Sequence, residues 1–352
     1  MDHFNGKTAG SYIVPFALPL SLAVNPDFLV LTGQIWGRAG LFGGIAIGLA
    51  AGAYLVLISR YRPADLENHP GIRFFGMTVR TLATVFLSTG ILVSSGFAFN
   101  EIFLYWFPNF GFAFLLLALA WGAQFLSRRA VHVLLAIFIA VPVSGLLVLT
   151  TAGMIRSGMD GSSIFHALPL ARAFPRTGTL FLALFLFVGY DLGFQVRTPH
   201  QGKADGKSAA AAVLFMGILF VCWGLVMLGH IPQEKLSQTS IPHLIAARKI
   251  WGEPGRIIMG LTIIFGSLAA VHGLFTWIFH RASRFFERKI MPGKLNRPQT
   301  VITLLAVTIG LMMGAGLAGS KTLEILIRII LILWVLSHGL VFFISDRSAE
   351  DK

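Results

Sequence analysis

Residues 184–199, LFLFVGYDLGFQVRTP, form an apolar stretch that is interrupted at its centre by the sequence GYDLG. Glycine weakens a helix, and an ionised carboxylate at bilayer depth costs roughly 2.5–3.5 kcal/mol on insertion scales. Such a break is tolerated only where the freed backbone groups line a protein-buried or water-filled cavity. The stretch is therefore typical of a discontinuous transporter helix with its ends directed at a solute. The residues that we expect to form one wall of a substrate site are Gly189, Tyr190, Asp191 and Gly193.

The composition indicates a polytopic membrane protein. The chain has 352 residues, of which 55% are hydrophobic and 12% charged, and its mean hydropathy is +0.77. Soluble domains carry about 25% charged residues. The net charge of +13 is explained by basic residues in short loops, so we expect no nucleic-acid partner. The single cysteine, Cys222, excludes an intramolecular disulfide and thiolate iron–sulfur ligation, and the polar start Met1–Gly10 argues against a cleavable signal peptide.

Ten segments are long and apolar enough to be predicted as membrane spans. They run approximately over residues 11–36, 41–58, 74–99, 110–126, 131–152, 178–196, 209–228, 257–279, 301–317 and 323–344. With a cytoplasmic N-terminus, 18 of the 28 basic residues fall in inside loops and nine in outside loops. This bias places both termini in the cytoplasm, and the protein in the cell (cytoplasmic) membrane.

Segment one contains a second predicted break. Residues 11–24 alone would span about 21 Å, which is too short for a hydrocarbon core of about 30 Å. Extending the helix to Trp36 requires passing Asn25-Pro26-Asp27, and proline removes a backbone donor and clashes with the preceding turn. We therefore expect a break near mid-depth, with Asn25 and Asp27 facing the substrate across from Asp191.

Breaks in the first and sixth of ten segments are what two inverted five-helix repeats would give. We predict an all-α membrane domain of ten helices in a 5+5 inverted repeat, with discontinuous helices 1 and 6. Residues 1–155 would form the first repeat and residues 156–352 the second, within a single transmembrane domain. The external loop 229–255 contains a predicted amphipathic helix, residues 240–251, which is read either as a lid or as a plain surface helix.

Three motifs resemble the amino acid–polyamine–organocation (APC) superfamily. FVGYD at 187–191 is similar to its sixth-helix pattern of aromatic, any residue, glycine, aromatic and acid. ASR at 282–284, running to Pro292, resembles the end of its eighth helix, and Arg297-Pro298 resembles the start of its ninth. The resemblance covers roughly residues 180–300, and it implies a leucine-transporter-type inverted-repeat fold and transport of an amino acid or amine.

The chain departs from that family at the substrate side of helix one. Family permeases usually have a glycine-rich break there, which receives the substrate carboxylate, whereas this chain has Asn25-Pro26-Asp27. A cation-bearing solute therefore suits the two acids better than a carboxylate alone. A divalent metal is the rival substrate, although related metal transporters use an Asp-Pro-Gly-Asn break and a helix-six methionine, and neither motif occurs in this sequence.

The candidates for coupling are Asp191, His272 and Ser267. Asp191 would take up a proton or bind the cationic group of the substrate, and its alternative role is to cap the following half-helix. His272, in segment eight, would carry a proton, or would simply make an interhelical hydrogen bond. Ser267 could offer a hydroxyl to sodium, but adjacent Ser/Thr pairs are missing from the middle of that segment, so we expect a proton rather than sodium.

We therefore predict a secondary active transporter, a symporter for a small amino acid, amine or similar cation-bearing solute that works by alternating access. The sequence also allows a non-transporting nutrient receptor or assembly subunit, and a redox subunit holding haem between His272 and His338. No P-loop, GxSxG, HExxH or paired-cysteine motif is present, so we expect no enzyme activity, catalytic residue, metal centre or cofactor. The sequence is compatible with an oligomer.

Overall fold

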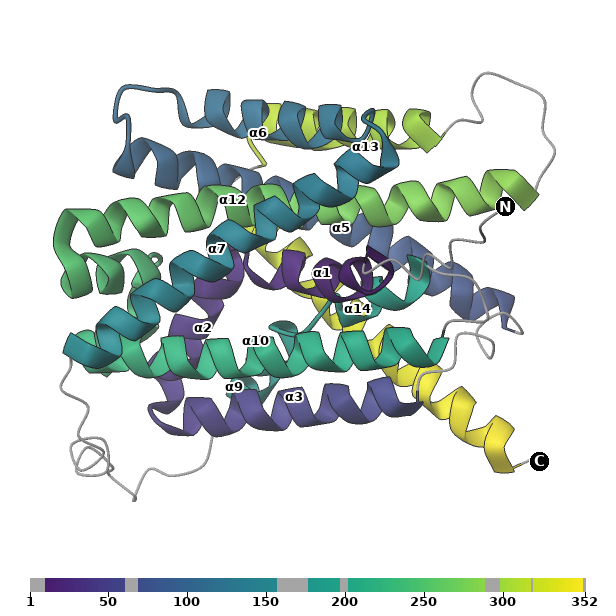
Figure 1. The fold of residues 1–352 in the computed structure, drawn as a ribbon, viewed down its shortest axis with the longest axis horizontal. Coiled ribbons are helices and arrows are strands. Elements are labelled where there is room, and N and C mark those ends of the chain that lie inside the picture. The colour runs from purple at the N-terminus through teal and green to yellow at the C-terminus, as the bar shows by residue number, and fades with distance from the viewer. Residues whose placement is uncertain are drawn as a thin grey trace, which may run out of the picture.

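The computed structural model describes residues 10–60, 69–156, 177–196, 202–288, 298–317 and 319–350, and within these ranges the chain forms helices and no strand (Figure 1). The elements are α1 (Gly10–Ala23), α2 (Pro26–Ala39), α3 (Phe42–Arg60), α5 (Pro70–Ile102), α6 (Asn109–Ala123), α7 (Arg128–Arg156), α9 (Thr177–Phe185), the 3-10 helix η2 (Tyr190–Val196), α10 (Gly202–His230), α11 (Gln233–Gln238), α12 (Pro242–Arg288), α13 (Pro298–Gly314) and α14 (Lys321–Glu350). Six helices of the described residues are long and apolar enough to cross a membrane, and the bent pair α1–α2 adds a seventh candidate span.

The predicted break in segment one is confirmed. Helix α1 ends at Ala23, α2 begins at Pro26, and the two are bent by 63°. Proline stands in the first turn of α2, where its missing N–H is not needed. The side chain of Asn25 caps α2: its Oδ1 accepts a hydrogen bond from the backbone N–H of Phe28 at 3.0 Å, and its Nδ2 donates to the carbonyl of Leu22. Asn25 thus satisfies backbone groups on both sides of the break.

The break in segment six is also confirmed. Helix α9 ends at Phe185, and after a turn the chain continues as η2 from Tyr190. Gly189 has a φ of 97°, in the left-handed region that favours glycine. A Cβ built on Gly189 would lie 2.6 Å from Cδ2 of Leu22, so the break of segment six packs directly against the last turn of α1. The two breaks therefore meet.

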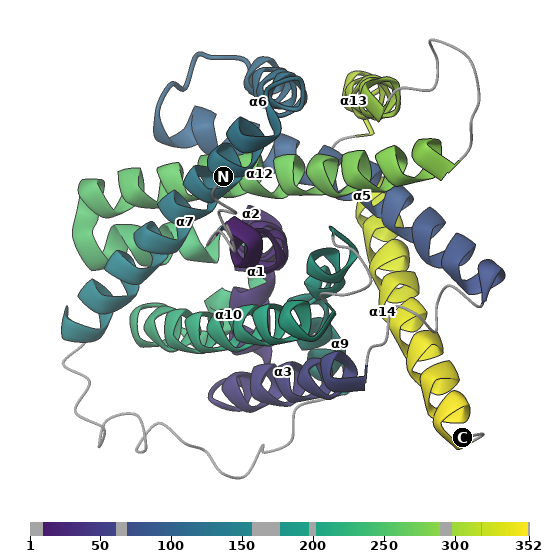
Figure 2. The same cartoon turned by 45° about the vertical axis from the view of Figure 1, so that its right-hand side comes forward.

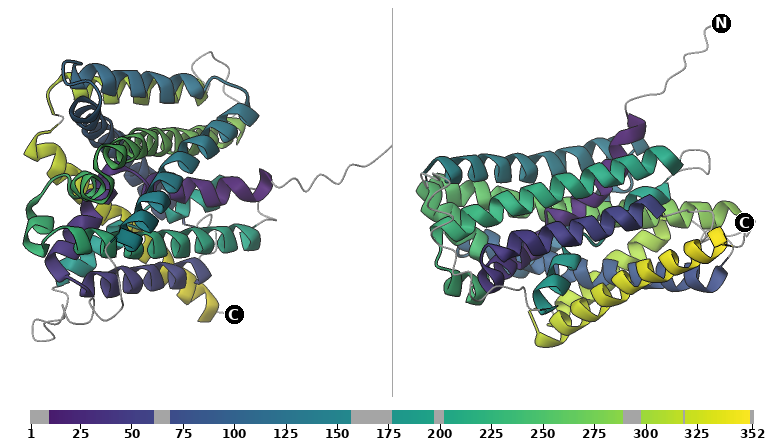
Figure 3. Two further views of the ribbon diagram at one scale, coloured as in Figure 1. Left: turned by 60° about the vertical axis from the view of Figure 1, so that its left-hand side comes forward. Right: turned by 90° about the horizontal axis from the view of Figure 1, so that it is seen from below.

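The helices form two groups, which Figure 2 shows clearly. Helices α1, α3, α9 and α10 pack together, and α5, α6, α12 and α13 pack together. Helix α7 crosses α12, and α14 runs along α5. In the left-hand view of Figure 3, α1 lies between the two groups. Side chains around it, such as Leu18, Leu22 and Phe275, are fully buried. The interface between the groups is therefore built on a broken helix.

The region after α10 packs on α2, the second half of segment one. Helix α2 presents glycines four and seven residues apart, at Gly33, Gly37 and Gly40, toward α11 and the start of α12. A Cβ on Gly37 would lie 2.3 Å from the backbone nitrogen of Ser237, and a Cβ on Gly33 would lie 2.5 Å from Cγ of Pro242. The backbones approach so closely because these residues have no side chain. Helix α11 and the start of α12 are therefore packed tightly against α2.

We expect Gly37→Ala to destabilise the packing of α11 on α2, because the added methyl group would meet backbone atoms that cannot rotate away. Overpacking of this kind costs about 1–3 kcal/mol. The matched control is Gly48→Ala in α3, where an added Cβ meets nothing within 4 Å. Thermal unfolding in detergent should separate the two variants, and equal melting temperatures would show that the close approach is not important for stability.

Two expectations need correction. The predicted helix 240–251 does form, as the start of α12 up to a kink at Gly252 (φ 64°), but its apolar face, including Leu244 and Ile250, is buried against the protein rather than lying free on the outer surface. Arg80 was one of the 18 basic residues assigned to inside loops, but it lies within α5 and is 6% exposed. Residues 157–176, residues 197–199 of the opening stretch, and the motif residues Pro292 and Arg297 lie outside the described residues.

Candidate functional site

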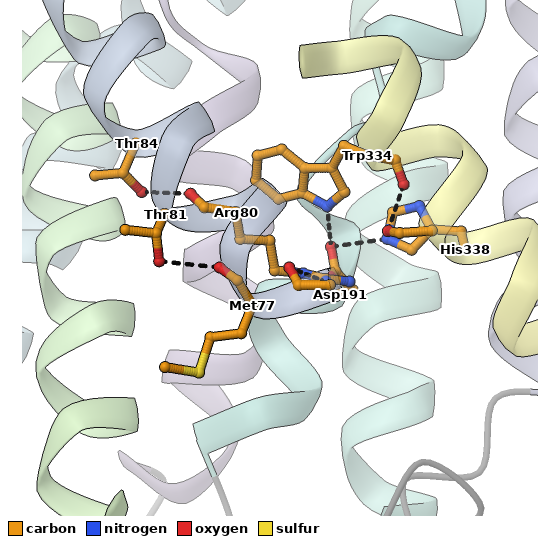
Figure 4. A network of polar contacts seen from close by, with 9 residues as sticks. Met77, Arg80, Thr81, Thr84, Asp191, Trp334 and His338 are labelled. Carbon is orange, nitrogen blue, oxygen red and sulfur yellow. Dashed lines mark hydrogen bonds and ion pairs between the residues drawn. The ribbon is translucent and has the colours of Figure 1, made fainter. Parts of the chain in front are cut away.

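Asp191 lies in a fully buried polar network between three elements. Its Oδ2 is 2.5 Å from Nε of Arg80, which comes from α5 (Figure 4). Its Oδ1 accepts a hydrogen bond from Nε1 of Trp334 at 3.2 Å and lies 3.2 Å from Nε2 of His338, both on α14. Arg80 also donates from Nη1 to the carbonyl of Gly76 at 2.7 Å, and its guanidinium lies 5.8 Å from the centre of the Trp334 ring.

This network explains how a carboxylate is kept at membrane depth. A buried charge is tolerated where it is paired and its remaining lone pairs are hydrogen-bonded. Both oxygens of Asp191 have such contacts, and the carboxylate is inaccessible to solvent. The charge of Asp191 is therefore already neutralised by Arg80, and binding of a substrate cation there would have to displace the arginine.

Tyr190 packs in an aromatic cluster rather than lining open space. Its ring centre is 5.0 Å from that of Tyr54, on α3, and 4.7 Å from that of His338. Phe194, on the next turn of η2, lies 6.1 Å away in an edge-to-face arrangement. Gly193 approaches α1 so closely that a Cβ would lie 2.4 Å from the carbonyl oxygen of Pro15. These contacts fix η2 between α1, α3 and α14.

Asp27 has a different environment. It stands in the first turn of α2, is half-buried, and accepts a hydrogen bond from Oγ of Ser94 at 3.0 Å. Its other oxygen lies near Gly90, at 3.5 Å from the position a Cβ would take there. Among the described residues no basic side chain forms an ion pair with it.

The structure does not bring Asp27 and Asp191 together. Both acids contact α5, but Asp27 is held by Ser94 and Asp191 by Arg80, which are 14 residues apart. At 1.5 Å per residue this is about 21 Å along the helix axis. The expectation that the two acids face one another across a single substrate is therefore not met, although the backbone breaks themselves are adjacent. The two acids therefore contact α5 at two different heights along its axis.

His272 is buried and both of its ring nitrogens are occupied. Nε2 lies 3.0 Å from the carbonyl oxygen of Val131, which can only accept, so this nitrogen carries the proton. Nδ1 then accepts from Nε2 of Gln124 at 2.9 Å. Gln124 caps the end of α6, and Val131 lies in the first turn of α7. His272 therefore joins α12 to the end of α6 and the start of α7 as a neutral ring, and His338 belongs to the separate network of Asp191.

We expect His272→Ala to lower stability and to leave the pH dependence of activity unchanged. The substitution removes the acceptor of Gln124 and the donor to Val131, and a buried polar group without its partner costs about 1–3 kcal/mol. Thermal unfolding and a pH profile of activity would check this. A shifted profile in the folded variant would instead assign a proton-carrying role to the ring.

Ser267 lies beside the break of segment one. Its Oγ is buried and has no hydrogen-bond partner in the described part of the chain. The preceding residue, Gly266, faces the Val24 carbonyl so closely that a Cβ would lie 2.2 Å from that oxygen. A hydroxyl on a membrane helix usually bonds to the carbonyl four residues earlier, as Thr262 does. The free hydroxyl of Ser267 is therefore available to another partner at the break.

Sequence reasoning missed the partners of both acids. Arg80 was assigned to a loop although it stands inside the apolar run 74–99, and a lone arginine within such a run is itself a signal of a buried partner. Trp334 would be read as packing, and Ser94 carries no signal beyond its residue type. These residues are distant in sequence from the acids they contact, so only the fold reveals the pairs.

No family model and no curated protein sequence matches this chain. Its structure is similar to that of a Na+-coupled sialic acid symporter solved in a substrate-bound outward-open state. The TM-score is 0.67 at 15% sequence identity, and the match covers 95% of this chain and 78% of the symporter chain. At this identity the likeness establishes the fold. The chain is a multi-pass helical membrane protein with the fold of a sodium-coupled symporter.

Proposed function

We propose that the protein is a secondary active transporter that moves a small solute by alternating access. The observation that carries this proposal is the meeting of two broken helices, at Leu22 and Gly189, within a symporter-like fold. Broken helices at mid-depth leave backbone groups and helix ends that bind solutes in this class of transporter. The group α1, α2, α3, α9, η2 and α10 would move against the group α5, α6, α12 and α13.

The same proposal includes the finer architecture predicted from sequence. The seven candidate spans, together with the three shorter apolar helices Asn109–Ala123, Gly178–Phe194 and Pro298–Gly314, would make ten segments in two inverted repeats, residues 1–155 and 156–352. Both termini would be cytoplasmic, and the chain would be a member of the APC superfamily. The motif FVGYD at the break of η2 supports this assignment.

The proposed substrate bears a cationic group, as an amino acid or amine does, and Asp27 is its binding partner. Asp27 is half-buried, lies at the break, and has no basic partner among the described residues. Asp191 is less suited to this role because Arg80 already neutralises it. A divalent metal remains the alternative cation. No group of three or more histidine, cysteine, aspartate or glutamate side chains gathers in the parts that the structure describes, which favours an organic cation.

The proposed coupling ion is sodium. The structural neighbour is Na+-coupled, so the comparison supports sodium and gives no support to the proton favoured by sequence reasoning. Sodium is a hard cation that prefers hydroxyl and carbonyl oxygens. Ser267 offers a buried hydroxyl with no described partner, and it follows Gly266, which packs against the Val24 carbonyl. His272, with both ring nitrogens occupied, is less suited to carry a proton.

Ligand-dependent thermal stabilisation of the purified protein tests the proposal. Amino acids, amines and divalent metals would be added in sodium chloride and, separately, in choline chloride, followed by uptake into proteoliposomes for any stabilising compound. A compound at a hundredfold excess over its Kd adds roughly 2.7 kcal/mol. We expect stabilisation by a cationic solute that is stronger in sodium, and sodium-dependent uptake. Binding without uptake would favour the nutrient-receptor function, and stabilisation by metals alone would favour a metal transporter.

A further inference from the structure

We propose that Arg80 and Asp191 form a lock that closes the cytoplasmic side of the solute path, an inference that rests on the proposed transport function. The pair joins η2, the inner half of segment six, to α5 in the opposite helix group. Because the two groups move relative to each other in the proposed cycle, an ionic contact between them is made in one state and broken in the other.

The depth of the pair fits a cytoplasmic lock. Helix α5 has 33 residues and a length of about 50 Å, which exceeds a hydrocarbon core of about 30 Å. Arg80 precedes the end of α5 at Ile102 by 22 residues, or about 33 Å, so in the proposed orientation it lies in the cytoplasmic half of the helix. Asp27 and Ser94, by contrast, lie about 12 Å from that end. The lock is thus on the cytoplasmic side of the proposed substrate site.

Helix α14 completes the lock. Trp334 donates to the Asp191 carboxylate and also lies against the Arg80 guanidinium, while His338 contacts the same carboxylate oxygen as Trp334 (Figure 4). The four residues are 6% exposed or less. When the cytoplasmic side of the path opens, water that enters it would hydrate both charges and offset the loss of the ion pair. The pair can then open without leaving an unsolvated charge.

The same interface contains a suitable reporter of closure. Ser21, on the inner half of α1, is 1% exposed and packs against α12: a Cβ on Gly273 would lie 2.2 Å from its Oγ. Helices α1 and α12 belong to opposite groups, so opening of the cytoplasmic side would expose position 21. Because Cys222 is the single cysteine in the chain, a Cys222→Ala background makes Ser21→Cys the sole reactive thiol.

The experiment measures the rate at which a membrane-impermeant maleimide labels Ser21→Cys in inside-out and right-side-out vesicles. The lock variant is Arg80→Gln/Asp191→Asn, which removes both charges and leaves neither unpaired. The control is Arg328→Gln/Glu324→Gln, which removes an exposed ion pair on α14. We expect the lock variant to raise labelling from the cytoplasmic side on the order of tenfold, as a shifted equilibrium would, and the control to leave it unchanged.

Unchanged labelling in the lock variant, or an equal rise from both sides, would overturn the proposal. Arg80→Lys, which keeps the charge but loses the planar contact with Trp334, should give an intermediate rate, and it replaces the double variant if that does not fold. Labelling does not depend on uptake. If the wild-type protein transports nothing but the lock variant still shows the expected rise in labelling, the transport function is refuted and the lock between Arg80 and Asp191 is retained.

Discussion

Asp27→Asn is expected to abolish uptake and to remove the thermal stabilisation given by the substrate, while the protein remains folded. The substitution keeps the size of the side chain and retains an oxygen that can accept from Ser94. A hydrogen bond to a charged group is worth about 1.5–3 kcal/mol, or roughly a 10- to 150-fold loss in affinity. The measurement is the shift in melting temperature with substrate, together with sodium-driven uptake in proteoliposomes.

The matched control for that prediction is Glu101→Gln, which changes an exposed acid near the end of α5, the helix that carries Ser94. This substitution removes one negative charge, as Asp27→Asn does, but it leaves the break between α1 and α2 unchanged. Loss of uptake in both variants would indicate a general effect of negative charge on this side of the protein. Normal uptake by Asp27→Asn would remove Asp27 from the substrate site and with it the argument for a cationic solute.

Asp191→Asn is expected to destabilise the protein more than any exposed substitution. It leaves the Arg80 guanidinium buried without its carboxylate, and breaking a buried ion pair by removing one partner costs about 3–5 kcal/mol. The double variant Arg80→Gln/Asp191→Asn should recover much of this loss, because no charge is left unpaired. Thermal unfolding of the single and double variants makes the comparison.

The control for the ion pair is Glu324→Gln, whose partner Arg328 lies on the same helix and is 62% exposed. Exposed pairs contribute about 0–1 kcal/mol, so this variant should melt close to the wild type. If Asp191→Asn and the double variant were equally unstable, the carboxylate would matter for its contacts with Trp334 and His338 rather than for its charge. That result would also weaken the proposed lock.

Asp191 shows that the sequence can locate a residue at a helix break without revealing the partners of its side chain. A carboxylate between two glycines in an apolar stretch indicates a helix break, and the break is present. The same carboxylate was expected to face the solute together with Asp27. The direction in which the Asp191 side chain points depends on which helix packs against η2. That helix is α5, which carries Arg80, 111 residues earlier in the chain.

Local chemistry was sufficient for the helices and their breaks. Apolar length predicted the helical segments, of which up to seven are candidate spans in the described residues. Pro26 and Gly189 predicted the two breaks, because a missing backbone donor and a left-handed φ act within a few residues. The partners of the buried polar groups were decided by tertiary packing. The sequence contains no periodicity that aligns Arg80 with Asp191, Ser94 with Asp27 or Gln124 with His272. These pairs form because buried charges and hydrogen-bonding groups in a membrane protein must be satisfied by whichever helix packs beside them, and that helix is chosen by the fold as a whole.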